Sequence, residues 1–430
     1  MENLVDSNLD IIKWENISQN WQEKIERSIS SENFPDYIVY PHDSENLSKI
    51  IKYARSHQLS IMPCGSGSKI TWGGLKKEIR LVVSTQKLDR IIEHAVDDLT
   101  VTVEAGVKLA DLQNILKDKG QFLALDPAYP ETATIGGIIA TADSGSWRSR
   151  YGGVRDMLLG ISFVRADGAI AKAGGRVVKN VAGYDLMKLF TGSYGTLGII
   201  QEATFRLYPL PEDSRTILLS GENEAIATAT QTLLNSTLTP TAADLLSSGL
   251  VKTLEIDTDM TSLMVRFQSI AESCTQQTKI LESIAKNLNL KTSLYQDKEE
   301  EKLWQRLQKI IRIPASTSSI TCKIGVLPTA AVETLNKLTQ LTNNSGLGLI
   351  RANSGLGYLN LDENIDTIKK MRSHLEKNRG FLTILAAQNQ IKQEIEPWGY
   401  TGNSLEIMAK IKQQFDPENI FNPGCFIGKI

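Results

Sequence analysis

Three glycine-rich segments are the part of this chain best suited to chemistry. They run over 63–74 (PCGSGSKITWGG), 126–137 (DPAYPETATIGG) and 192–200 (GSYGTLGII). Glycine in ordered structure costs about 0.5–1 kcal/mol relative to alanine, so clusters of it need a reason. Close approach of main-chain N–H groups to a phosphorylated ligand is such a reason. Three clusters with strand-like segments between them indicate a long cofactor with a pyrophosphate in its middle.

Each cluster is weak evidence when taken alone. Gly65–Lys69 (GSGSK) lacks the Gly-Lys-Ser/Thr end of a Walker A loop, and a structural glycine turn explains it equally well. Thr134–Gly137 would place unbonded N–H groups beside a helix start, whereas a hairpin glycine pair is the alternative. The segment 174–185, with Lys179 and Asn180, is either a glycine turn or a support that holds the third cluster against a cofactor.

Composition excludes several classes of protein. The chain has 430 residues, is 41% hydrophobic and carries a formal net charge of −2, which argues against a nucleic-acid or anionic-membrane surface. The first residues (MENLVDSNLD) lack the basic and apolar regions of a secretory signal, and the apolar runs are too short to span a bilayer. The four cysteines, Cys64, Cys274, Cys322 and Cys425, are scattered. We therefore expect buried thiols, no iron–sulfur cluster and no metal site.

The elements that must position the glycine clusters can be predicted from local patterns. An amphipathic helix is expected over 9–30, followed by a strand at Tyr37–Tyr40 and a helix opened by His42-Asp43-Ser44. A short strand at Ser60–Pro63 leads directly into the first glycine cluster. Asp167-Gly168 predicts a hairpin between two apolar strands.

After Pro211 the pattern changes. Strands and helices mix without the βαβ rhythm of a doubly wound fold, which indicates an α+β layer with an antiparallel sheet. The charged run 296–302 (QDKEEEK) is expected to be a solvated loop or a helix start. The expected strands are 216–220, 262–267, 319–325, 348–352, 356–361 and 381–386, and the expected helices are 228–234, 277–288, 365–377 and 405–415.

The fold class expected from these patterns is α+β, in four parts. An N-terminal helix occupies 1–32 and a glycine-rich α+β domain occupies 33–211. A second α+β domain, a cap with an antiparallel sheet, occupies 212–400. A C-terminal segment, 401–430, returns toward the first domain.

The order of the motifs carries more specificity than any motif alone. PCGSGS, VTVEAGV, LDP, TIGGIIA, GSWRSRYGGVRD, KNVAGYDLMKLFTGSYGTLGII and FRLYPLPE follow one another, and the tail reads FDPENIFNPGCF. This succession resembles the PCMH-type FAD-binding domain of the vanillyl-alcohol oxidase family, strongly over 33–211 and well over 397–426. Within the family it is most similar to the second of the FAD-binding subunits of glycolate oxidase.

The resemblance implies a two-part FAD-binding domain, a cap domain and a tail that returns to the flavin. It also implies non-covalent FAD, because members with covalent flavin use a His near these loops. The four histidines here, His42, His57, His94 and His374, lie in no matching context. The implied cofactor-binding positions are, in the pyrophosphate loop, Pro63, Gly65, Ser66, Gly67, Ser68 and Lys69; toward the second phosphate and adenine, Pro127, Thr134, Ile135, Gly136 and Gly137; along the ribityl and ring region, Ser144, Gly145, Tyr151 and Gly152; in the last strand, Gly195, Gly198, Ile199 and Ile200; and, approaching the isoalloxazine from the second domain, Asn422.

The catalytic residues are less clear. The family's 2-hydroxy-acid dehydrogenases carry a His-rich motif followed by Gly-Asp-Gly-Asn, whereas the matching stretch 351–360 (RANSGLGYLN) has neither His nor Asp. Oxidation of a 2-hydroxy acid needs hydride transfer to the flavin, a base for the hydroxyl proton and a cation for the carboxylate. Arg351 or Arg312 could be the cation, and Tyr358 or Tyr400 a weak base. A surface arginine and a packed tyrosine are the alternatives, since a phenol with a pKa near 10 is a poor base.

Three functions remain open at this point. The missing His/Asp motif favours an FAD-binding subunit of a glycolate oxidase/dehydrogenase-type complex, acting on glycolate or a related small 2-hydroxy acid. Its expected partners are a His-bearing FAD subunit and an iron–sulfur subunit. Its expected location is the cytoplasm, with any membrane contact made through the partners.

The alternatives are an autonomous FAD-dependent 2-hydroxy-acid dehydrogenase and a non-catalytic, flavin-containing structural subunit. A nucleotide-binding module unrelated to redox chemistry lacks its Walker A and Rossmann fingerprints.

Overall fold

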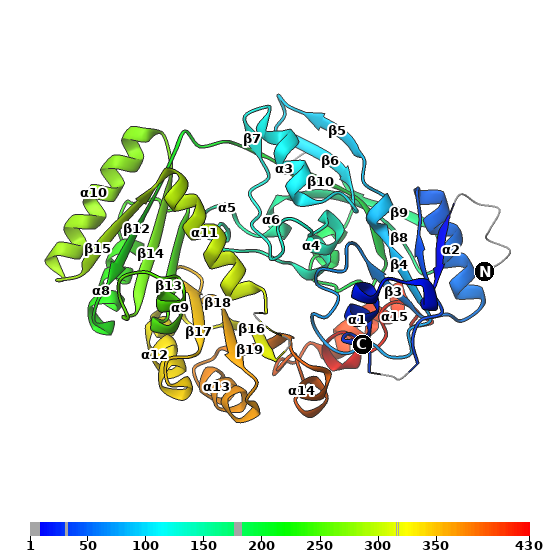
Figure 1. Ribbon diagram of the computed structural model, residues 1–430. Coiled ribbons are helices and arrows are strands. Elements are labelled where there is room, and N and C mark those ends of the chain that lie inside the picture. The colour runs from blue at the N-terminus through cyan, green and yellow to red at the C-terminus, as the bar shows by residue number, and fades with distance from the viewer. Residues whose placement is uncertain (1–8, 31–32, 176–182, 315, 317) are drawn as a thin grey trace. The chain divides into compact units, whose positions relative to one another are not determined.

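The computed structural model describes residues 9–30, 33–175, 183–314, 316 and 318–430. These residues form two compact units, each with its own sheets (Figure 1). The first unit comprises the chain up to Ser144, Gly153–Leu210 and Thr401–Ile430. The second comprises Gly145–Gly152 and Pro211–Tyr400. The first unit is therefore assembled from three separate stretches of chain.

A four-stranded sheet opens the first unit. Its order is β1 (Asp10–Lys13), β2 (Tyr37–Tyr40), β4 (Leu81–Ser84) and β3 (Ile61–Cys64), with β2, β4 and β3 parallel and β1 antiparallel at the edge. Helix α2 (Ser44–Ser56) begins at Asp43, whose carboxylate accepts a 2.7 Å hydrogen bond from the Asn46 amide. Its buried residues pack on the sheet in one core that also contains Val39, Ile61 and Val83.

The expected helix over 9–30 is wrong in part. Asp10–Lys13 is an edge strand, and only Gln19–Glu26 is α-helical (α1), after a 3₁₀ turn at Trp14–Asn16. Ile11 and Ile12 pack into different cores, as the two-residue period of a strand requires. Pairing with β2 outweighs the local helical pattern, because it satisfies backbone groups along the sheet edge.

A five-stranded antiparallel sheet completes the first unit. Its order is β5 (Ile91–Ala95), β6 (Thr100–Glu104), β10 (Ile199–Arg206), β8 (Leu158–Val164) and β9 (Ile170–Gly174). The β8–β9 hairpin turns at Asp167-Gly168, as predicted. The other elements of this unit are β7 (Gln121–Phe122), β11 (Tyr208–Pro209), α3 (Leu109–Lys117), α4 (Ile135–Thr141), α6 (Val154–Met157), α7 (Leu186–Phe190), α15 (Leu405–Phe415) and 3₁₀ turns at Thr85–Lys87 and Ile427–Lys429.

A buried ion pair holds the C-terminal segment on the first unit. The Lys412 ammonium lies 2.5 Å from a carboxylate oxygen of Asp416 and donates to the main-chain oxygens of Thr196 and Phe421, each at 2.9 Å. The same carboxylate accepts the amides of Ile420 and Phe421 at 3.0 and 2.8 Å. Burial lowers the pKa of Lys412, against the opposing effect of Asp416. The pair shapes the turn that carries the last residues back to strand β3.

The second unit is built on one eight-stranded antiparallel sheet (Figure 1). Its order is β15 (Lys291–Gln296), β12 (Asp213–Ser220), β14 (Ser262–Ser269), β13 (Ala242–Leu246), β17 (Leu347–Arg351), β18 (Leu356–Asp362), β16 (Ser319–Gly325) and β19 (Phe381–Ala386). Its helices are α5 (Arg148–Tyr151), α8 (Asn223–Leu234), α9 (Ser248–Thr253), α10 (Ala271–Asn287), α11 (Asp297–Arg312), α12 (Ala331–Thr342), α13 (Ile365–Lys377) and α14 (Asn389–Glu394), with a 3₁₀ turn at Pro328–Ala330. The α+β class with a large antiparallel sheet is confirmed.

The two faces of this sheet differ. Alternate strand residues such as Ile217, Val265 and Ile324 face helices α8, α10, α12 and α13 in one apolar core. Helix α11 packs on the other face, where it contacts β12, β15, β17 and β18. This second face carries polar residues such as Thr216 and Arg266 together with apolar ones such as Leu218.

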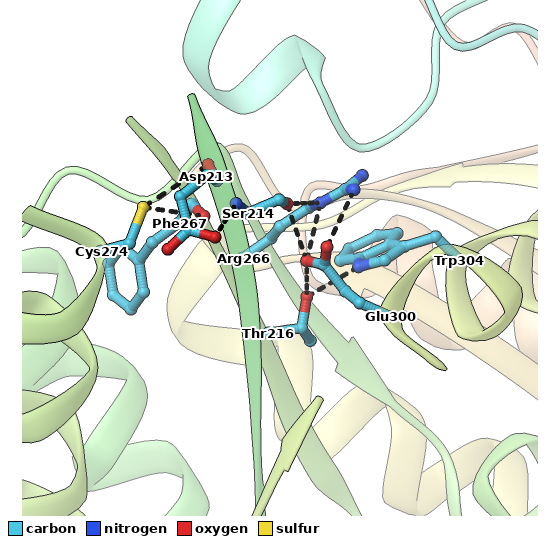
Figure 2. A network of polar contacts seen from close by, with 8 residues as sticks. All are labelled: Asp213, Ser214, Thr216, Arg266, Phe267, Cys274, Glu300 and Trp304. Carbon is cyan, nitrogen blue, oxygen red and sulfur yellow. Dashed lines mark hydrogen bonds and ion pairs between the residues drawn. The ribbon is translucent and has the colours of Figure 1, made fainter. Parts of the chain in front are cut away.

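The charged run 296–302 begins helix α11, as one of the two expectations had it, but it is not wholly solvated. Glu300 is 2% exposed and accepts hydrogen bonds from Ser214 at 2.9 Å and Thr216 at 2.6 Å (Figure 2). Arg266 pairs with the same carboxylate at 3.0 Å, and the Trp304 indole donates to Thr216 at 2.8 Å. These contacts fix α11 to strands β12 and β14. In the part of the chain that the structure describes, no helix is both long and apolar enough to cross a bilayer.

Candidate functional site

One cavity in the first unit gathers the three glycine clusters and the C-terminal tail. It encloses about 790 Å³ of space, open solvent at its mouth included. Its walls come from β3 and the loop after it, from α4, from the loop before β10 and from the tail. The predicted cofactor-binding residues that line it are Pro63, Gly65, Ser66, Gly67, Ser68, Lys69, Thr134, Gly136, Gly137, Gly195, Gly198, Ile199, Ile200 and Asn422.

The first two clusters touch at Gly65. A Cβ atom added there would lie 2.0 Å from the Thr134 hydroxyl oxygen, far inside van der Waals contact. Only glycine allows this approach, and Thr134 begins helix α4. The loop after β3 and the start of α4 thus form one continuous wall.

The two clusters differ in the backbone donors that they offer. Within the described residues, the amides of Ser66, Gly67 and Ser68 donate to no protein acceptor. The amides of Ile135 and Gly136 are already bonded, to the carbonyls of Val107 at 2.9 Å and Ala105 at 2.8 Å. The expectation that the start of α4 offers a row of unbonded N–H groups is therefore wrong for these two residues. The loop after β3 is the better donor of main-chain hydrogen bonds to a phosphate.

Lys69, in the same loop, is already neutralised. Its ammonium lies 3.0 Å from an Asp143 carboxylate oxygen, and both side chains are almost completely buried. The same oxygen accepts the Ala128 amide at 2.9 Å. Lys69 therefore acts first as a brace between two walls of the cavity, because its charge has an internal partner.

The third cluster meets the tail and the first loop at Gly195. This residue has φ of +70°, and an added Cβ would lie 2.9 Å from Pro63 and 3.1 Å from the Asn422 amide nitrogen. The Asn422 side chain donates a 2.7 Å bond to the carbonyl of Tyr194, and its backbone amide donates to Ile61 at 2.9 Å. Asn422 thus belongs to the first unit, not to the second domain from which it was expected to approach.

Three buried polar atoms around this cavity have no hydrogen-bond partner within the described residues. They are the indole nitrogen of Trp72, the hydroxyl of Ser193 and the side-chain oxygen of Asn422. These residues are 2%, 5% and 3% exposed. Buried polar groups are usually bonded, so three orphaned atoms around one cavity fit a site for a polar ligand, although other orphaned atoms are found elsewhere in both units. A cofactor with phosphates and a heterocyclic ring fits this wall chemically.

Some predicted cofactor positions lie elsewhere. Pro127, Ile135 and Ser144 belong to the first unit but do not line the cavity. Gly145, Tyr151 and Gly152 belong to the second unit, where the Ser149 hydroxyl bonds to the Asn353 side chain at 3.1 Å and the Asn353 amide to the Ser149 carbonyl at 3.2 Å. Lys179 and Asn180 lie outside the described residues. The remaining cofactor assignments stay predictions.

Sequence reasoning missed several residues of the cavity wall. Trp72, Ser193 and Cys425 stand inside motifs that were recognised, so their neighbours were a usable signal. Lys76 stands in no motif, and only the fold brings it to the wall. Cys64 lines the cavity and keeps some surface exposed, while the surrounding protein desolvates its thiol and raises its pKa to about 12.

In the second unit, three of the four catalytic candidates come together. The Arg312 guanidinium donates to the Tyr358 hydroxyl at 3.4 Å and lies 4.9 Å from its ring centre, and the Arg351 guanidinium lies 5.5 Å from the same centre. All three are at most 3% exposed, so a surface arginine is the wrong interpretation of both arginines. They sit on the α11 face of the sheet, where Asn360 donates to the carbonyl of Ile310 at 3.2 Å. Tyr400 is the last residue of the second unit, and its role stays a prediction.

The described residues contain no group of three or more His, Cys, Asp and Glu side chains arranged to hold a metal ion.

Comparison with known proteins finds two matching segments, which lie mostly in the first unit. Residues 35–174 match the family model of an FAD binding domain, and residues 391–425 match the C-terminal domain of FAD linked oxidases. Glycolate oxidase subunit GlcD of Bacillus subtilis is 34% identical over 225 residues, 52% of this chain and 48% of that protein. The chain thus spans about half the length of this relative.

Two further similarities cover nearly the whole chain. The mitochondrial cytochrome D-lactate dehydrogenase of Arabidopsis thaliana is 28% identical over 421 residues, 92% of this chain and 74% of that protein. The structure of p-cresol methylhydroxylase aligns with a TM-score of 0.74 at 13% identity and covers 97% of this chain and 98% of that one, which shows a shared fold. Residues 35–174 and 391–425 are therefore similar to the FAD-binding and C-terminal domains of FAD linked oxidases, and nearly the whole chain shares its fold with p-cresol methylhydroxylase.

Proposed function

We propose that this chain is the FAD-binding subunit of a glycolate oxidase/dehydrogenase-type complex that oxidises glycolate or a related 2-hydroxy acid. The observation that carries the proposal is the cavity of the first unit, with its unbonded loop amides and three orphaned polar atoms. The similarity to a glycolate oxidase subunit supports the choice of system.

FAD is held without a covalent bond in this proposal. The amides of Ser66, Gly67 and Ser68 receive the diphosphate, and Asn422 lies toward the ring. No histidine lines the cavity among the described residues. When bound, FAD supplies the ring that accepts a hydride. Acid precipitation of the holoprotein should release all flavin into the supernatant, whereas flavin retained in the pellet would contradict non-covalent binding.

The substrate chemistry divides between this chain and a partner. Oxidation transfers a hydride from the α-carbon and a proton from the hydroxyl group, and it leaves a 2-oxo acid. Arg312 and Arg351 are the cations that could hold the substrate carboxylate. Tyr358, whose ring lies against both guanidinium groups, is a weak candidate for the base. The stretch 351–360 offers no imidazole or carboxylate in its place.

The proposed partners follow from that division. A His-bearing FAD subunit supplies the base, and an iron–sulfur subunit accepts the electrons. We place the complex in the cytoplasm, with contact to a membrane only through those partners.

A second candidate is an autonomous 2-hydroxy-acid dehydrogenase. The similarity to a D-lactate dehydrogenase along 421 residues favours it, because that match includes the second unit. The third possibility is a structural subunit, which would bind FAD in the same cavity but would not use it to oxidise the substrate.

One experiment separates the three. The purified chain, loaded with FAD, is mixed with glycolate or D-lactate without oxygen, alone and then with the partner subunits. Bleaching of the flavin only in the complex, and more slowly in a complex that carries Arg351→Met, supports the role of a complex subunit. Bleaching by the chain alone establishes the autonomous enzyme. Flavin in this chain that stays oxidised in the complex, while the partner's flavin is reduced, establishes the structural role.

A further inference from the structure

Lys76 is a buried cation in the cavity wall with no ionic partner among the described residues. It is 3% exposed, and its ammonium donates to the main-chain oxygen of Ile70. No described carboxylate lies within ion-pair distance of it. The Lys69 ammonium, by contrast, has Asp143 at 3.0 Å. One of the two lysines that line the cavity is thus neutralised within the protein, and the other is not.

An ammonium buried without a counter-ion is costly, because one carbonyl replaces little of its hydration. No Asp or Glu is among the described residues that line the cavity. In our proposal the occupant supplies the compensating negative charge. FAD carries negative charge in two places, on the diphosphate and, when the ring is reduced, on the isoalloxazine.

The chain around Lys76 favours the charge on the ring. Its segment runs beside the tail, since Gly74 donates to the carbonyl of Cys425 at 2.9 Å and Lys77 to that of Pro423 at 2.8 Å. Both accepting residues come just after Asn422, which we propose to lie toward the ring. The unbonded amides proposed for the diphosphate, Ser66–Ser68, lie just before Ile70, whose carbonyl accepts the Lys76 ammonium, so the test below also measures a contact with the diphosphate. The Lys76 ammonium also acts on Cys64, another residue of the cavity wall, and lowers the pKa of its thiol against the effect of burial.

We propose that the Lys76 ammonium stabilises the negative charge of the reduced isoalloxazine ring and so makes the bound flavin easier to reduce. The proposal rests on the FAD assignment and not on the identity of the substrate. Lys76 is a positioning and tuning residue, because it transfers neither the hydride nor the proton.

The test uses the full chain loaded with FAD and needs no hydroxy acid. Lys76→Met removes the charge at similar length, and Lys76→Gln removes it while keeping a hydrogen-bond donor. Lys77→Met is the matched control, since Lys77 is the next residue but is exposed. Sulfite is the probe, because its adduct places negative charge on the flavin ring. The readouts are the sulfite dissociation constant, the two-electron midpoint potential and the FAD dissociation constant.

We expect both Lys76 variants to bind sulfite at least about tenfold more weakly, while their affinity for FAD changes by less than about threefold. A tenfold loss of stabilisation of the reduced form corresponds to a midpoint potential lower by about 30 mV for a two-electron couple. Lys77→Met should match the wild type, and Lys76→Arg should recover part of the sulfite affinity.

Three results would overturn the proposal. Unchanged sulfite affinity and potential in Lys76→Gln would show that the charge does not reach the ring, and this variant decides the matter if Lys76→Met fails to fold. Unchanged sulfite affinity with about tenfold weaker FAD binding would assign the charge to the diphosphate. A wild-type chain that takes up no flavin would overturn the cofactor assignment together with the role of Lys76. Failure of hydroxy-acid oxidation alone would leave all these readouts intact.

Discussion

The cavity wall of the first unit and the Glu300 network of the second place polar groups in opposite situations. At Glu300, each polar side chain bonds to another within the same unit, and a guanidinium and a carboxylate neutralise each other (Figure 2). At the cavity, Trp72, Ser193 and Asn422 each leave a buried polar atom without a partner among the described residues. A network whose members satisfy one another stabilises a fold, whereas orphaned atoms around a cavity can bond to a ligand.

The same contrast separates the charges. Arg266 with Glu300, Lys69 with Asp143 and Lys412 with Asp416 are internal pairs that brace elements. Lys76 has no such partner within the described residues. The two regions can therefore be told apart by mutation: changes in the internal pairs should affect stability, and changes in the cavity wall should affect flavin.

The largest effect is expected for Asp416→Ala. The change leaves the Lys412 ammonium buried without its carboxylate and the amides of Ile420 and Phe421 without their acceptor. Removing one partner of a buried pair costs about 3–5 kcal/mol, which denaturant unfolding would measure. Glu418→Ala, which removes an exposed pair with Arg55, is the control and should cost less than about 1 kcal/mol. Equal losses in the two variants would show that the buried pair does not hold the tail.

Glu300→Gln should destabilise the second unit by about 2 kcal/mol and leave flavin affinity unchanged. The amide keeps the shape of the carboxylate but leaves the Arg266 guanidinium without its counter-charge. Unfolding curves and flavin titration measure the two quantities on one preparation. If Glu300→Gln also weakened flavin binding, the Glu300 network would not be purely structural, and the contrast with the cavity wall would be wrong.

Gly137→Val should show the converse behaviour. Its added Cβ would meet only the Thr134 hydroxyl, at 3.2 Å, so most of the side chain projects into the cavity. We expect FAD to bind at least about tenfold more weakly, with stability of the unloaded protein nearly unchanged. Gly175→Ala, where an added Cβ meets nothing within 4 Å, is the control. Wild-type flavin affinity in Gly137→Val would contradict the placement of this residue at the cofactor.

Two thiols give the smallest effect. Burial raises the pKa values of Cys64, at the cavity, and Cys322, in the core of the second unit, to about 12. A folded-state pKa above the unfolded value of 9.0 contributes stability below pH 9, and this contribution is lost as the pH rises toward 12. Denaturant midpoints at pH 8 and pH 10 should therefore differ less in Cys322→Ala than in the wild type. An identical difference would contradict the shift.

Much of the fold could be predicted from local pattern. Phe381–Ala386 and Ile365–Lys377 form the predicted strand and helix, because apolar periodicity reports burial directly. Asp10–Lys13 was missed, since its strand conformation depends on pairing with a strand more than twenty residues away. Glu300 stands in a charged run that predicts solvation, and its burial escapes local pattern because its partners come from strands far away in the sequence.

The candidate site follows the same rule. Glycine clusters predict the cavity, because a residue without a side chain lets other groups come close to the backbone, as Thr134 does at Gly65. Other features depend on the tertiary structure and could not be predicted from a motif. The Gly136 amide donates to the Ala105 carbonyl, Lys69 forms an ion pair with Asp143, and Lys76 lines the cavity. Arg312 and Arg351 can be named from the sequence, but only the sheet brings both guanidinium groups to Tyr358.

Binding of FAD in the cavity of the first unit underlies every other proposal made for this chain. Titration of the flavin-depleted wild-type chain with FAD, followed by flavin fluorescence and absorbance, measures that binding. We expect saturable uptake of one FAD per chain, weakened in Gly137→Val and unchanged in Glu300→Gln. A folded wild-type chain that stays colourless and shows no saturable uptake would contradict an FAD site in this cavity.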